Sequence, residues 1–218
     1  MRVRRIYATL FVALLSLVLA NSAFANSVTM NYVGHQGAVA HDGSPFIGYP
    51  YYFSINGSTS YTTLMCDSFD NNIIPGETWQ AKVTPFGQGI GMFGSTMSMD
   101  YKAAGLIFKS MLMGQISTTA AQWAIWGLFS ANAKNDPFFA TIGAGHIDSI
   151  YLGLAATAKS GAFSGLVLYT PIAGTQSGGG LPQEFIGFGT VPEPGSLTLL
   201  GTGLLGLAGA IRRKFAKS

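Results

Sequence analysis

The chain has 218 residues, of which 48% are hydrophobic, and it carries a single cysteine. This length and composition allow one or two domains and exclude a collagen-like or disordered chain, and one cysteine excludes an internal disulfide. Three of the 12 Lys and Arg residues lie within the first five positions and four within the last seven, so five remain between them, against eight acidic residues when Glu193 near the C-terminus is set aside. We therefore expect no nucleic-acid partner, because the body of the chain has no basic face for phosphates.

The N-terminus has the composition of a secretory signal. Three arginines open the chain, an apolar stretch follows over residues 6–20, and the small side chains of Ala23 and Ala25 suit a signal peptidase. We predict a signal peptide over residues 1–25, export by the Sec machinery and a mature chain that starts at Asn26. The alternative, an uncleaved membrane anchor, fits the short apolar stretch less well.

The first half of the mature chain has the patterns of β-strands. Val28, Met30 and Tyr32 alternate with polar residues, and Asn56-Gly57 is a turn signal. The strands that we predict are residues 28–32, 49–55, 62–69 and 77–84. From residue 85 to residue 98 the chain is rich in Gly, Ser and Met and is predicted to be a long loop.

The middle of the chain changes to a helical period. Asp100 is predicted to cap a first helix that ends at Gly114, and Ser117 to cap a second helix that runs to about Phe129. The buried stripe of the first helix would consist of Ala104, Ile107, Phe108, Met111 and Leu112. A third helix is predicted from about His146 to Ala158.

Two more strands follow, at residues 165–170 and 183–188. Strands, then helices, then strands predict an α+β fold, in which an antiparallel sheet or barrel carries a packed helical subdomain. We place this extracellular domain at residues 26–190.

The C-terminus has three parts, of which the middle one is long enough to approach the thickness of a membrane. The parts are a stiff motif (Val191, Pro192, Glu193, Pro194), an uncharged stretch at residues 195–211, and a basic tail (212–218) that contains Arg212, Arg213 and Lys214. The uncharged stretch would form about 26 Å of helix, close to the ~30 Å of a hydrocarbon core. We predict a transmembrane helix whose basic cluster stays in the cytoplasm. An ordinary tail anchor or a dimerisation helix is the alternative.

This three-part pattern resembles the PEP-CTERM sorting signal of Gram-negative bacteria, and the resemblance covers residues 191–218. It implies processing by an exosortase near residues 192–194, a transient stay in the inner membrane, and then the cell surface or the exopolysaccharide matrix.

Two residues of the predicted extracellular domain carry chemistry that needs an explanation. Cys66 is a lone thiol on a predicted strand, whose parity places it on one face with Leu64 and Ser68. Gln122 lies on the second helix, in line with the apolar positions of its core-facing stripe. Burial of an amide without hydrogen-bond partners costs roughly 1–3 kcal/mol, so the Gln122 amide should either form hydrogen bonds or take part in a reaction.

A Cys66 thiolate that attacks the carboxamide of Gln122 would expel ammonia and leave an internal thioester. An amine or a hydroxyl on a surface target could then take the acyl group in a single-use reaction, so we expect no enzyme, no metal and no cofactor. This pair resembles the bacterial thioester domain of the TQXA type, on Met65-Cys66 and on the string Ala121-Gln122-Trp123-Ala124-Ile125-Trp126. In that family a Thr stands at the position of Ala121.

Two other functions remain open. One is a passive matrix protein in which Cys66 is a free, buried thiol. The other is a carbohydrate- or ice-binding module. Its aromatic platform would come from Trp79, Trp123, Trp126, Tyr49, Tyr51 and Tyr52. Residues at these spacings are more often part of a core.

Overall fold

The computed structural model describes residues 27–35, 39–41, 44–47, 49–86, 91–94, 98–178 and 182–189, together with Gly203 and Gly206. The predicted signal peptide with Ala23 and Ala25, the motif at 191–194 and the basic cluster at 212–214 lie outside these residues, as does the predicted membrane helix apart from those two glycines. Within the described part of the chain, every helix lacks either the length or the apolar composition that a membrane span requires.

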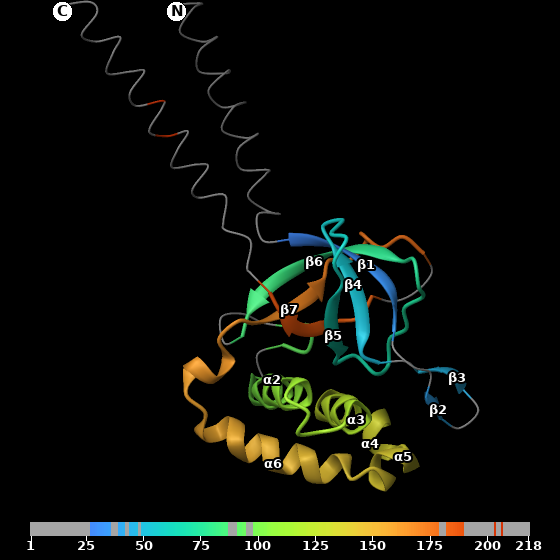
Figure 1. Cartoon of the computed structure of the whole chain (residues 1–218), viewed down its shortest axis with the longest axis vertical. Helices are drawn as coiled ribbons and strands as arrows, with labels where there is room; N and C mark the ends of the chain where they lie inside the picture. Colours follow the sequence, from blue (N-terminus) through green and yellow to red (C-terminus); the bar gives the residue numbers. More distant parts are fainter. Residues whose placement is uncertain are drawn as a thin grey trace, which may run out of the picture. The chain divides into compact units, whose positions relative to one another are not determined.

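Six strands form a closed antiparallel barrel (Figure 1). In chain order they are β1 (Ser27–His35), β4 (Tyr51–Ile55), β5 (Thr62–Cys66), β6 (Thr78–Pro85), β7 (Leu166–Pro171) and β8 (Phe185–Phe188). Around the barrel the order is β1, β4, β5, β8, β7 and β6. Two short strands, β2 (Val39–His41) and β3 (Ser44–Ile47), form a separate hairpin between β1 and β4.

The interior of the barrel is filled by alternate side chains of its strands, as expected for a small barrel. Met30 of β1, Phe53 of β4 and Trp79 of β6 are each at most 1% exposed. The ring centroid of Phe53 lies 4.6 Å from that of Phe185 on β8 and 5.6 Å from that of Trp79. The predicted alternation in β1 and β6 is therefore explained by burial of one face.

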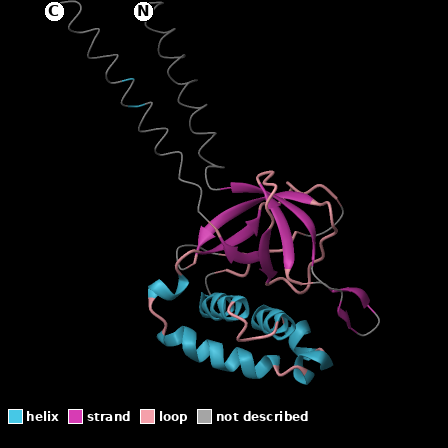
Figure 2. Ribbon diagram, viewed as in Figure 1, coloured by secondary structure: helices cyan, strands magenta, loops and turns pink. Residues whose placement is uncertain are grey.

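The helices are inserted between β6 and β7 and lie together at one end of the barrel (Figure 2). They are α2 (Ser98–Leu112), α3 (Thr118–Phe129), α4 (Ala131–Asn135), α5 (Pro137–Thr141), α6 (Ala144–Thr157) and the 3₁₀ helix η2 (Ser160–Phe163). Helices α2 and α3 lie next to the strands, and α6 packs on their far side (Figure 1). The predicted α+β class is confirmed, and the sheet is a closed barrel.

Several local predictions need correction. Helix α2 begins at Ser98, so Asp100 lies in its first turn and is not its cap. Leu112 is 48% exposed, because it is the last residue of α2 and the chain then turns at Gly114, whose φ is +71°. The strand predicted at residues 62–69 ends at Cys66. The hairpin β2–β3 and the short helices α4 and α5 were not predicted.

Gly127 of α3 allows α3, α5 and α6 to approach one another closely. A Cβ at this position would lie 2.3 Å from Cε2 of Phe139 and 2.8 Å from Oδ2 of Asp148. We expect Gly127→Ala to lower the free energy of unfolding by about 1–3 kcal/mol, since the helices must move apart to admit the methyl group. Urea denaturation measures this loss.

Gly153→Ala is the matched control, because a Cβ at this exposed position of α6 meets nothing within 4 Å. This substitution should stabilise the protein by about 0.5–1 kcal/mol through the higher helix propensity of alanine. Equal effects of the two substitutions would contradict the close packing of the three helices.

Candidate functional site

Cys66 and Gln122 meet where the barrel contacts the helices. Cys66 is the last residue of β5, Gln122 lies on α3, and both side chains are 0% exposed. Helix α3 begins as predicted, with the hydroxyl of Ser117 accepting a hydrogen bond from the Ala120 amide at 3.2 Å. This cap determines where the helix starts and therefore which of its residues face β5.

The carboxamide of Gln122 binds the backbone of Cys66 through two hydrogen bonds. Its Oε1 accepts from the Cys66 amide at 3.3 Å, and its Nε2 donates to the Cys66 carbonyl at 2.5 Å. The structure thus brings together two residues that lie 56 positions apart in the chain.

This contact also continues the hydrogen-bonding pattern of the sheet. Strand β4 begins at Tyr51, which pairs with Leu64 of β5, so no β4 residue stands opposite Cys66 two positions further along. The Gln122 amide occupies that place and satisfies a backbone N–H and C=O that would otherwise be buried without partners. The polar position on the apolar stripe of α3 therefore has a structural explanation, in addition to any chemistry.

The thiol of Cys66 is turned toward the backbone of Ser68. Its sulfur accepts a hydrogen bond from the Ser68 amide at 3.2 Å, and the S–H donates to the Ser68 carbonyl at 3.6 Å. Burial raises the pKa of this thiol, and the neighbouring Asp67 raises it further, while the indole of Trp126 and the Ser68 amide lower it. The neutral thiol is therefore the resting form, and any attack by sulfur requires that its proton be removed.

A pair of buried carboxyl groups lies beside this contact. Glu184 accepts hydrogen bonds from the hydroxyl of Tyr101 at 2.5 Å and from the amide of Met92 at 2.8 Å. Asp67 accepts one from the hydroxyl of Ser68 at 3.0 Å, and its Oδ2 is buried without a hydrogen-bond partner among the described residues. Burial, followed by the charge of Glu184, raises the pKa of Asp67 well above its ordinary value, which favours the neutral acid.

Sequence reasoning did not identify Asp67 or Glu184 as site residues. The available signal was that Asp67 directly follows Cys66. Strand parity puts Asp67 on the face opposite Cys66, but all five residues from Leu64 to Ser68 are buried. Because this end of β5 is covered on both faces, both rows of side chains belong to the site.

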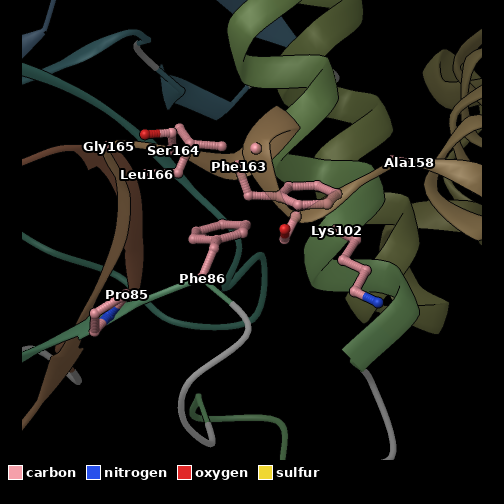
Figure 3. Close-up of a pocket in the computed structure, with 10 residues that line it drawn as sticks. Pro85, Phe86, Lys102, Ala158, Phe163, Ser164, Gly165 and Leu166 are labelled. Carbon is pink, nitrogen blue, oxygen red and sulfur yellow. The ribbon is translucent and has the colours of Figure 1, made fainter.

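Of the six aromatic residues considered for a platform, Tyr52 is partly buried and the other five are buried. Trp79 and Trp123 are at most 1% exposed and belong to the core. Tyr51 and Trp126, which also belong to the core, line a pocket of about 800 Å³ beside Cys66. A second pocket, of about 600 Å³, lies between the end of β6, α2 and η2, where Phe86 and Phe163 stack with centroids 6.5 Å apart (Figure 3). Neither Cys66 nor Gln122 lines either pocket.

Comparison with known proteins identifies a sorting motif at the C-terminus. Residues 190–214 match the family described as the PEP-CTERM protein-sorting motif. No curated protein and no solved structure matches the chain. The comparisons give no support to the resemblance between the central region and the bacterial thioester domain. The chain therefore carries a PEP-CTERM sorting motif, which indicates an exported protein that an exosortase processes and that is destined for the cell envelope or surface.

Proposed function

We propose that this exported protein acts as a surface or matrix adhesin in which Cys66 and Gln122 form an internal thioester. The observation that carries the proposal is the position of the Gln122 carboxamide, which is wholly buried and held by two hydrogen bonds on the backbone of Cys66. Reacting groups that are held in place in a dry site react far faster than free ones.

The contacts of the amide suit an attack on its carbonyl carbon. As the sulfur adds to Cδ of Gln122, negative charge develops on Oε1, which already faces the amide N–H of Cys66. A donor that is in place before the reaction stabilises such an oxyanion. The nitrogen that leaves is held by the carbonyl of Cys66. The C–S bond forms, the C–N bond breaks, and ammonia departs.

The proton of the thiol must reach the departing nitrogen. We assign this transfer to Asp67, which directly follows Cys66 and whose charge acts on the Cys66 thiol, because a neutral carboxyl can accept a proton on one oxygen and release one from the other. Its Oδ2 has no hydrogen-bond partner among the described residues. The amide N–H of Ser68 stabilises negative charge on the sulfur during the attack.

The completed thioester would store an acyl group for one transfer to an amine or a hydroxyl on the cell surface or in the exopolysaccharide matrix. Since the acyl group is consumed, the protein would act once and without turnover. Sorting by the PEP-CTERM motif would bring the domain to these targets.

Intact-mass spectrometry of the exported protein tests the proposal. We expect a mass lower by one ammonia than the processed sequence requires, and the full mass for both Cys66→Ala and Gln122→Ala. Gln115→Ala is the matched control: Gln115 is an exposed glutamine just before α3, and its loss should leave the ammonia deficit unchanged.

Methylamine supplies an independent readout, because it should open the thioester, add one methylamine and release a thiol. A wild-type protein of full mass, whose thiol alkylates once the chain is unfolded, would instead support a passive matrix protein with a free cysteine.

A further inference from the structure

The pocket beside Cys66 has one aromatic side. Its four aromatic members come from β1, β4, the segment after β5 and α3: Tyr32, Tyr51, Phe69 and Trp126. Trp126 lies one helical turn beyond Gln122 on α3, and its indole affects the pKa of the Cys66 thiol. The aromatic side of the pocket therefore separates solvent from the Cys66–Gln122 contact.

The rings do not form a closed cage. Phe69 meets Trp126 edge to face, with centroids 5.2 Å apart and an interplanar angle of 69°. Tyr32 and Tyr51 are tilted by 49° at 5.8 Å. Phe69 is only partly buried, so this ring has surface left for a ligand.

The other side of the pocket carries carboxamides. Asn71, Asn72 and Gln183 line it, and Asn72 is exposed. Gln183 is 4% exposed, and its Nε2 donates to the carbonyls of Ser68 and Asn71. Its Oε1 is buried without a hydrogen-bond partner among the described residues. A buried acceptor is usually hydrogen-bonded, and at the wall of a pocket a ligand or a water can supply the donor.

The charged side chains that line a pocket, or their absence, indicate which class of ligand it can bind. No Asp, Glu, Lys or Arg is among the described residues that line it. A cationic amine would find no carboxylate there, and an anion would find no Lys or Arg but only the imidazole of His35. Carboxamides both donate and accept hydrogen bonds, as do hydroxyl groups. Apolar C–H faces of a ligand would pack on the aromatic rings.

We infer that this pocket binds a neutral carbohydrate, with a sugar ring against Phe69 and Trp126 and its hydroxyls on Asn72 and Gln183. The inference goes beyond the proposed function, because binding of the sugar does not require a thioester.

Binding is tested in the full chain with Cys66→Ala, which cannot form a thioester. The probe is an array of neutral glycans, and each glycan that binds is titrated by NMR. We expect saturable binding that Phe69→Ala weakens by roughly tenfold or more. The matched control is Phe86→Ala, a half-buried phenylalanine of the second pocket (Figure 3), which should leave the affinity unchanged.

Asn72→Ala is a second variant, which tests the amide side at an exposed position where folding is not at risk. It should also weaken binding. The inference would be overturned by an array without binders or by affinities that neither Phe69→Ala nor Asn72→Ala alters. Saturable binding of an N-acetyl-lysine amide in place of glycans would also overturn it.

The glycan titration and the intact-mass measurement test the two proposals separately. Failure of binding with an ammonia deficit present rejects only the pocket. Binding without that deficit rejects only the thioester.

Discussion

Removal of the Gln122 carboxamide is expected to cost about 2–5 kcal/mol of folding free energy, even where no thioester can form. Its two hydrogen bonds satisfy the backbone N–H and C=O of Cys66, both in a fully buried environment. An alanine at position 122 leaves these two groups without partners and also leaves a cavity.

The measurement is made in a Cys66→Ala background, which keeps the backbone of residue 66 but excludes a covalent bond. Urea denaturation of Cys66→Ala, alone and combined with Gln122→Ala, gives the contribution of the two hydrogen bonds and the lost packing. Gln115→Ala in the same background should change the free energy of unfolding by less than about 0.5 kcal/mol, because Gln115 is exposed. A comparably small loss for Gln122→Ala would mean that the amide does not complete the sheet.

Asp148 is expected to make the protein less stable as the pH rises toward neutrality. Its carboxyl is 6% exposed, and both oxygens lack a hydrogen-bond partner among the described residues. Burial raises the pKa of Asp148 to about 7, with a further increase from Asp100 and an opposing effect of Lys134. The folded protein therefore holds a proton that the unfolded chain releases near pH 4.

The sign follows from proton binding. Below about pH 4 both states are protonated, and the stabilising effect of the raised pKa is fully present. Between about pH 4 and pH 7 the folded state binds more protons than the unfolded state, so the free energy of unfolding falls as the pH rises. The total loss from this group is about 2–4 kcal/mol.

Asp148→Asn keeps the shape of the protonated acid and removes the titration. We expect the variant to become more stable relative to the wild type, measured as the free energy of unfolding, as the pH rises from about 4 to about 8. Comparison with the wild type cancels the contribution of Asp67, whose raised pKa acts in the same direction. Parallel pH profiles for the two proteins would show that Asp148 titrates normally.

The amino-acid sequence determined the features that are encoded locally. The sorting motif was recognisable from about 28 consecutive residues, and its match at residues 190–214 confirms it. The start of α3 at Ser117 and the buried faces of β1 and β6 follow from a cap and from period-two patterns, each contained in a short window of chain. The α+β class follows from the order of such windows.

The tertiary structure alone decided closure of the barrel, the contact of Cys66 with Gln122 through the backbone, and the burial of Asp67 beside Glu184. Strand parity predicted two faces for β5 but not that both would be covered. Coverage depends on helices that lie more than 30 residues away in the chain. The role of the Gln122 amide depends on where β4 starts, because the place it fills exists only beyond Tyr51. These features depend on contacts between surfaces that lie far apart in the chain, and the local periodicity of the sequence does not encode such contacts.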